Sequence, residues 1–156
     1  MSDPAIEAAV ARLNARYIAA IDADRLEDWP GFFADPCTYQ IISAENHEQG
    51  MPIGLFFANS RGMLQDRVRA LREANIYAAQ RYRHVLSPSL VLDVEDGVVR
   101  AETNYHVVRI LADGAMALFS TGRYLDRIAL APEPHFVEKL VICDSRRIDT
   151  LLAIPL

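Results

Sequence analysis

The sequence predicts an α+β fold, in which N-terminal helices pack on a curved antiparallel β-sheet. Apolar residues recur at helical spacing in the first half of the chain, up to about residue 75. After residue 80 the sequence changes to four β-rich runs, most of them separated by turn-forming dipeptides. Helices that cover one face of a curled sheet enclose a cone with an interior pocket, so we expect a single conical domain over residues 1–156.

The first helix is predicted over residues 3–22. Asp3 can cap its N-terminus and Pro4 suits the first helical position. Its apolar stripe consists of Ile6, Val10, Leu13, Tyr17 and Ile21. A second, shorter helix is expected to begin at Asp24, with Glu27 three residues later as the reciprocal partner of a capping box.

The middle of the chain is predicted to contain one strand, one loop and one helix. Residues 37–42, CTYQII, have the composition of a strand. Residues 43–54 are polar with glycine and proline, which predicts a loop. A third helix with a narrow apolar stripe is predicted from about Ser60 to Asn75.

The second half of the chain is predicted to be a meander of four strands. These strands are expected at about 81–94, 98–111, 116–129 and 135–145. Asp96-Gly97 and Asp113-Gly114 separate the first three, and such dipeptides favour tight hairpin turns. The last gap, APEP, contains two prolines and predicts a longer loop.

Composition and charge exclude several classes of function. The net charge of −5 argues against nucleic acid as a general partner, because neutralising phosphates requires a basic surface. No apolar run approaches the roughly 20 residues that a membrane span needs. The N-terminus does not resemble a signal peptide, so we expect a cytoplasmic protein. Cys37 and Cys143 form no metal or redox motif and are expected to be free, mostly buried thiols.

Motifs for metal binding, nucleophilic catalysis and phosphate binding are all missing from the sequence. The four histidines show no H-x-x-x-H spacing, and neither G-x-S-x-G nor a glycine-rich phosphate loop is present. One catalytic option remains: a conical pocket can carry out proton transfer without a cofactor. The candidates for such a pocket are Tyr17, Tyr39, His84 and Asp126. The alternative is that Tyr17 packs in the core, Asp126 pairs with an arginine and His84 is simply hydrogen-bonded.

Several stretches carry a resemblance to a known family. The element order, with WPGFF after the first helix, resembles the NTF2-like cone of ketosteroid isomerases and scytalone dehydratases. The detailed resemblance is to the small (β) subunit of Rieske-type aromatic-ring-hydroxylating dioxygenases, above all the terephthalate dioxygenase and salicylate hydroxylase small subunits, and it covers essentially the whole chain. The stretches that carry it are DADRLEDWPGFFADPCTYQI, ENHEQGMP, MLQDRVRALREANIY, RYRHVLS and VEKLVICDSRRIDTLLAIPL.

The resemblance implies a division of labour between two subunits. A large (α) subunit would carry a Rieske [2Fe–2S] cluster and a mononuclear Fe(II), and three large and three small subunits would form an α3β3 hetero-hexamer. The small subunit would carry no catalytic residue, cofactor or metal of its own. The whole oxidoreductase would oxidise an aromatic carboxylate such as terephthalate or salicylate. The alternative function is a free-standing NTF2-like isomerase or dehydratase that uses the internal pocket.

A subunit of this kind needs aromatic and arginine anchors on an outer surface. On a strand, Arg81 and Arg83 point to one face, while Tyr82 and His84 point to the other. We therefore expect the two arginines to face another subunit, and His84 to face the cone. The full set of expected interface residues is Trp29, Arg81, Arg83, Asp144 and Arg146. The apolar ending DTLLAIPL is expected to form a last strand or to dock on the partner.

Overall fold

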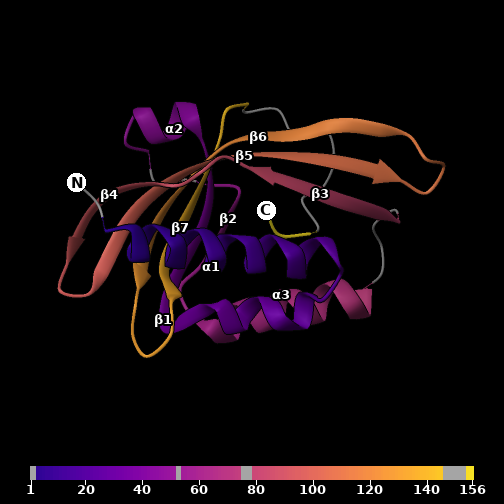
Figure 1. Ribbon diagram of the computed structural model, residues 1–156. Coiled ribbons are helices and arrows are strands. Elements are labelled where there is room, and N and C mark those ends of the chain that lie inside the picture. The colour runs from indigo at the N-terminus through magenta and orange to yellow at the C-terminus, as the bar shows by residue number, and fades with distance from the viewer. Residues whose placement is uncertain (1–2, 52–53, 75–78, 146–153) are drawn as a thin grey trace.

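The computed structural model describes residues 3–51, 54–74, 79–145 and 154–156 as helices set against a strongly curved sheet (Figure 1). The elements, in chain order, are α1 (Pro4–Asp22), the 3₁₀ helix η1 (Leu26–Phe32), β1 (Phe33–Ser43), α2 (Ala44–Glu48), β2 (Phe56–Ala58), α3 (Arg61–Ala74), β3 (Gln80–Leu86), β4 (Leu90–Glu95), β5 (Val98–Leu111), β6 (Met116–Ala129) and β7 (His135–Cys143). Within these residues, none of the helices combines the length and apolar character needed to cross a bilayer.

The first helix begins as predicted, but the second does not. Asp3 caps α1 by accepting a hydrogen bond from the backbone N–H of Ala5 at 2.8 Å. The predicted capping box of Asp24 and Glu27 is wrong, because η1 starts at Leu26 without a side-chain cap. Both carboxylates instead bind the Arg72 guanidinium of α3, at 3.0 Å and 2.7 Å. A partner distant in sequence has therefore replaced the local cap.

The sheet is mixed and not purely antiparallel. Its strand order is β2-β1-β7-β6-β5-β3, and β4 pairs with β5 beside β3. Every pairing is antiparallel except that of β1 with β7, which is parallel. The expectation of an antiparallel sheet is corrected at this one pair, which joins the first strand of the chain to the last described one.

One local prediction in each half of the chain is also corrected, and one short strand was missed. Residues 43–54, predicted as a loop, contain the short helix α2, which Ser43 caps by accepting from the backbone N–H of Asn46 at 3.2 Å. The short edge strand β2 was not predicted. The run at 81–94 is two strands, β3 and β4, because Pro88 interrupts the pairing of this run with β5. The Asp96-Gly97 turn is confirmed, and both of its residues have positive φ.

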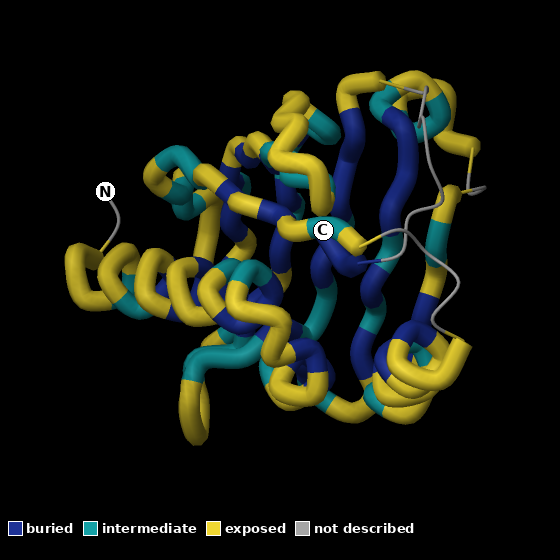
Figure 2. Tube along the Cα trace, turned by 90° about the vertical axis from the view of Figure 1, so that its right-hand side faces the viewer, coloured by how far each residue is buried: buried dark blue, intermediate teal, exposed yellow. Residues whose placement is uncertain are grey.

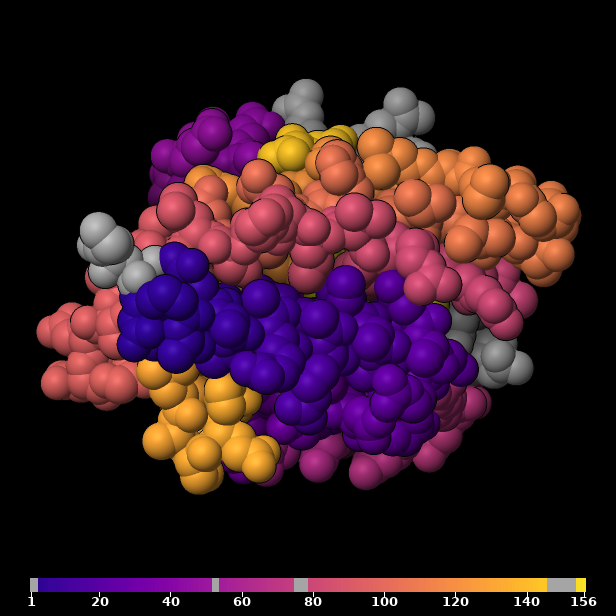
Figure 3. Space-filling view, viewed as in Figure 1, coloured from indigo at the N-terminus to yellow at the C-terminus, as the bar shows by residue number. Residues whose placement is uncertain are grey.

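The core lies between the helices and the concave face of the sheet. In Figure 2 the strands carry long buried runs, whereas the outward faces of the helices are exposed. The C-terminal end of the chain lies between the sheet and α1 (Figure 1), and Ile154 and Leu156 are both buried. The long β5–β6 hairpin projects beyond the helices, so part of its surface is not covered by them (Figure 3).

Candidate functional site

The interior of the cone holds a buried ion pair on two neighbouring strands. Asp126 of β6 lies opposite Lys139 of β7, and the Lys139 ammonium donates to both carboxylate oxygens at 3.0 Å and 3.1 Å. The ammonium also lies 3.6 Å from the centroid of the Tyr124 ring and 4.3 Å from that of Phe136. Burial raises the pKa of Asp126 and lowers the pKa of Lys139, and the attraction between the two charges opposes both shifts. Each charge of this pair is therefore compensated by the other.

The end of the chain occupies the middle of the cone. The hydroxyls of Tyr17 and Tyr39 donate to the Leu156 backbone oxygen at 3.0 Å and 3.1 Å, and the Leu156 N–H donates back to the Tyr39 hydroxyl. The Trp29 indole N–H donates to the Tyr17 hydroxyl at 3.0 Å. The cavity left beside Tyr39 is only about 10 Å³. The described residues therefore leave no room for a substrate beside Tyr39.

His84 lies at a separate point of the interior, against the end of α1. Its Nδ1 is 2.6 Å from Asp22 Oδ1, and its backbone N–H donates to Asp22 Oδ2 at 2.8 Å. The side chain of His84 is fully buried and that of Asp22 nearly so. The carboxylate thus fixes the orientation of the imidazole ring, and His84 is hydrogen-bonded, as the simpler of the two interpretations expected.

The four pocket candidates consequently do not form one catalytic group. Tyr17, Tyr39 and Asp126 all lie deep in the core, but Asp126 pairs with Lys139 and not with an arginine. Burial raises the pKa of both tyrosines, so their phenols stay protonated at neutral pH. Because each group already has a hydrogen-bond partner, and the cavity beside Tyr39 is small, the arrangement favours a structural role.

The described residues also offer no metal centre. Among them, no three His, Cys, Asp or Glu side chains come together in a way that could hold a metal ion. Cys37 and Cys143 are free and buried, as predicted, and burial raises the pKa of each thiol. A buried thiol with a raised pKa is a poor nucleophile.

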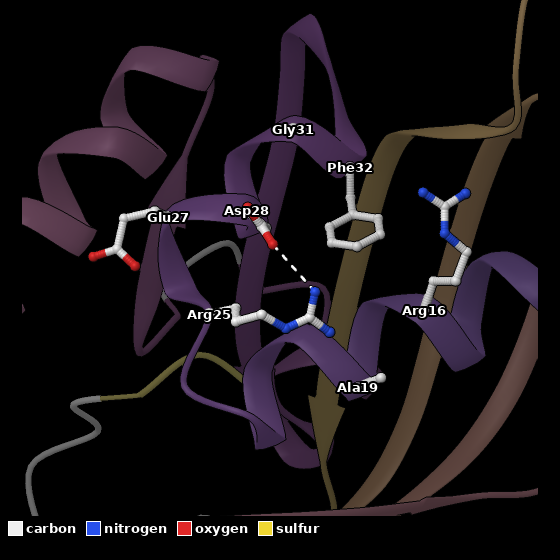
Figure 4. A pocket seen from close by; sticks show the side chains of 7 residues that line it. All are labelled: Arg16, Ala19, Arg25, Glu27, Asp28, Gly31 and Phe32. Atoms are coloured by element: carbon white, nitrogen blue, oxygen red, sulfur yellow. Dashed lines mark hydrogen bonds and ion pairs between the residues drawn. The ribbon is translucent and has the colours of Figure 1, made fainter.

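A further hollow on the surface lies outside the cone, between the end of α1 and η1 (Figure 4). It is open to solvent and has a volume of about 460 Å³. Arg25 on its wall pairs with Asp28 at 3.3 Å, and the Arg16 guanidinium lies 5.9 Å from the centroid of the Phe32 ring. The hollow thus contains a solvated ion pair beside one aromatic ring, without a buried titratable group.

The most distinctive surface is the outer face of β3, β5 and β6 where the helices do not cover it. Arg81 and Arg83 are exposed on this face, while Tyr82 and His84 point inward, so the predicted alternation is confirmed. The register places Ile110 and Met116 beside Arg81, and Val108 and Leu118 beside Arg83. Met116 is 72% exposed, Leu118 61% and Val85 56%. We call the residues Arg81, Arg83, Val85, Val108, Ile110, Met116 and Leu118 the outer patch.

The remaining expected interface residues have different positions. Asp144 is exposed, and its backbone N–H donates to the Thr121 backbone oxygen. Thr121 pairs with His106, and His106 pairs with Val85, so Asp144 lies three strands away from Val85 of the outer patch. Trp29 is fully buried among aromatic side chains, and its ring centroid lies 5.2 Å from that of Tyr39. The expectation that Trp29 lies at an interface is therefore corrected. Arg146 lies outside the described residues.

Several residues of the interior and of the outer patch were missed from the sequence. Met116 and Leu118 could have been found, because strand alternation places them on the outer face with the arginines. The pairing of Asp22 with His84 had no local signal, since 62 residues separate the two.

Comparisons with known proteins show the family to which the chain belongs. The sequence pattern of the ring hydroxylating beta subunit family matches residues 16–149. The chain is 39% identical over 151 residues to the terminal oxygenase component subunit beta 2 of terephthalate 1,2-dioxygenase from a Comamonas species, covering 96% of this chain and 98% of that one. It is 40% identical over 145 residues to the anthranilate 1,2-dioxygenase small subunit of Burkholderia cepacia, covering 92% and 90%.

A solved structure gives the same result in three dimensions. A crystal structure described as the beta subunit of an aromatic-ring-hydroxylating dioxygenase of Novosphingobium aromaticivorans matches with a TM-score of 0.90 and 37% identity, covering 97% of each chain. The open curved sheet with its helices is the NTF2-like fold of these subunits. The chain belongs to the ring hydroxylating beta subunit family and is the small subunit of an aromatic-ring-hydroxylating dioxygenase.

Proposed function

We propose that this small subunit acts in the cytoplasm as the structural half of an α3β3 hetero-hexamer that oxidises an aromatic carboxylate such as terephthalate or salicylate. The named relatives support an acidic aromatic substrate, since they are dioxygenases of terephthalate and anthranilate. The Rieske [2Fe–2S] cluster and the mononuclear Fe(II) belong to the large subunit in this proposal. The contribution of this chain is to bind and support that subunit.

The single observation that carries the proposal is the outer patch. Protein interfaces are enriched in arginine and methionine around an apolar centre, and the outer patch combines two arginines with exposed Met116 and Leu118. No described residue gives the Arg81 or Arg83 guanidinium an ion-pair partner, so both are available to carboxylates of the large subunit. A groove of about 400 Å³ beside Arg81 and Ile110 offers space for a side chain of the large subunit.

Charge reversal tests this interface. The chain carrying R81E and R83E, co-expressed with the large subunit of its own oxygenase, is expected to co-purify at least tenfold less large subunit than the wild type does. The reversed charges repel the carboxylates that the arginines bind. The readout is the ratio of the two subunits after affinity purification on a tag carried by this chain.

The matched control carries R12E and R69E. Both of these arginines are exposed on helices, away from the outer patch, and the change in net charge is the same. This control is expected to retain the large subunit. If the R81E and R83E chain folds and still binds the large subunit like the control does, the outer patch is not the interface.

A further inference from the structure

We propose that the free edge of β4 binds an extended, basic segment of the large subunit, which adds to the sheet as a further strand. This inference rests on the proposed function, because it takes the large subunit as the partner. It concerns a second surface, since β4 pairs with residues 98–102 of β5, whereas Val108 and Ile110 of the outer patch lie near the other end of that strand.

β3 and β4 follow each other along the same side of β5, and their outer edges differ. The backbone N–H of His84 in β3 donates to Asp22 at the end of α1 at 2.8 Å, so α1 occupies part of that edge. In the described part of the chain, β5 is the only strand that pairs with β4. An edge strand without a neighbour presents unpaired backbone N–H and C=O groups, which can bind a strand of another chain.

The exposed side chains of β4 are mostly apolar. Leu90 is 61% exposed, Leu92 43% and Val94 45%. Exposed edge strands often carry lysine or proline, which discourage pairing with another chain, and β4 contains neither. The register with β5 shifts at Leu92, so the residues on either side of it are the ones that can pair with a new strand. The turn after β4 projects beyond α1 (Figure 3), which leaves this edge within reach of a partner.

The charge of the β4–β5 hairpin indicates a basic occupant. Residues 90–102 contain four acidic residues and one arginine. Two of the acidic residues, Asp93 and Glu102, pair with arginines at 2.9 Å and 3.1 Å. Glu95 and Asp96 are exposed and have no ion-pair partner among the described residues. Lysine or arginine side chains of the partner segment would bind these two carboxylates, while the arginines of the outer patch attract acidic groups, so the two surfaces together orient the large subunit.

Hydrogen exchange of the β4 amides tests this inference without any substitution. Exchange is measured by mass spectrometry for this chain alone and for its co-purified complex with the large subunit. We expect the peptide over residues 90–95 to exchange at least tenfold more slowly in the complex, because the added strand occupies N–H groups that face solvent in the chain alone. The peptide over residues 61–74, which form α3, is the internal reference and should be unchanged.

A pair of substitutions tests the side chains of the same edge. The chain carrying L92S and E95K loses an exposed apolar contact and reverses one charge, and should co-purify at least threefold less large subunit than the wild type does. The matched control carries M63S and E73K on α3. Met63 is 41% exposed, Glu73 is also exposed, and the change in net charge is the same. This control should retain the large subunit.

The possible contrary results are distinguishable. Unchanged exchange of β4 in an intact complex overturns this inference and leaves the proposed function standing, as does a folded L92S and E95K chain that binds like the control. Exchange that slows in the chain alone as its concentration rises would assign the edge to a second copy of this chain and would also overturn it. A wild-type chain that co-purifies no large subunit would overturn the proposed function together with this inference.

Discussion

Lys139 and Asp126 show how single residues constrain this fold. Both side chains are fully buried, and the charge of each is compensated mainly by the other. One of the two interpretations of the sequence paired Asp126 with an arginine, and the sequence analysis did not identify Lys139. The information was present: Lys139 lies on the inward side of β7 with Val141 and Cys143, where a charged residue requires a partner. Strand alternation could have found this lysine, whereas its partner depends on the register between β6 and β7.

Removing one member of this pair should be costly. K139M is expected to lower the free energy of unfolding by about 3–5 kcal/mol, because Asp126 is left buried without its counter-charge. Adding D126L, which replaces the carboxylate by an apolar side chain of similar shape, should restore most of the loss. R100M removes the exposed pair with Asp93 and should cost less than about 1 kcal/mol. Urea denaturation of the variants measures these differences, and a K139M chain as stable as R100M would contradict a closed buried pair.

The same variant should respond to pH in a defined direction. Burial raises the pKa of Asp126 above its ordinary value of 3.8, and Lys139 opposes that shift. Without Lys139 the folded state therefore binds a proton more tightly than the unfolded state does. Stability then falls as pH rises from the unfolded pKa through the folded pKa. We expect K139M to be less destabilised near pH 4 than near pH 7, relative to wild type at the same pH.

At the scale of elements, residues 154–156 act as an internal support of the cone. Leu156 receives two tyrosine hydroxyls and donates its own N–H to Tyr39, and Ile154 is buried nearby. The apolar ending DTLLAIPL was expected to form a strand or to dock on a partner. Its residues 149–153 lie outside the described part, and its last three residues pack inside this chain.

Two tyrosine variants separate this support from simple burial. Y39F removes a hydroxyl that both donates to and accepts from Leu156, and should cost about 2 kcal/mol. Y124F removes a buried hydroxyl that has no partner among the described residues, and should be neutral or slightly stabilising. Thermal unfolding measures both, and hydrogen exchange at the Leu156 amide should accelerate in Y39F alone. Equal stability of the two variants would show that residues 154–156 are not held by Tyr39.

Local sequence signals predicted where helices and turns lie better than they predicted which elements contact each other. Helical periodicity identified α1 and α3 to within about a residue or two, and the Asp96-Gly97 turn was found because few dipeptides accept positive φ. The capping box failed because Arg72, distant in sequence, binds both Asp24 and Glu27. The parallel pairing of β1 with β7 could not be predicted from periodicity, which reports the faces of a strand and not its neighbour.

At the scale of the whole molecule, side chains and the end of the chain occupy the interior of the cone, whereas the helices leave part of the outer sheet face uncovered. The interior that could have been a pocket contains an ion pair, aromatic side chains and the end of the chain. The outer patch carries exposed apolar residues and two arginines beyond the cover of the helices. The resemblance to dioxygenase small subunits predicted this role, and alternation on β3 predicted where its arginines point. Trp29 was misplaced because an aromatic residue suits an interface and a core equally well in sequence.

This chain supports catalysis without taking part in it, and turnover of the assembled oxygenase distinguishes this role from a catalytic one. The measurement is kcat, with terephthalate or salicylate, of complexes containing the wild-type chain, Y17F or Y39F, with assembly checked by size. A general acid or base contributes about 10²–10⁴-fold to a rate. We predict that both variants keep kcat within about twofold of wild type. A loss of about a hundredfold or more in an intact complex would instead show that the interior of this chain is part of the active site.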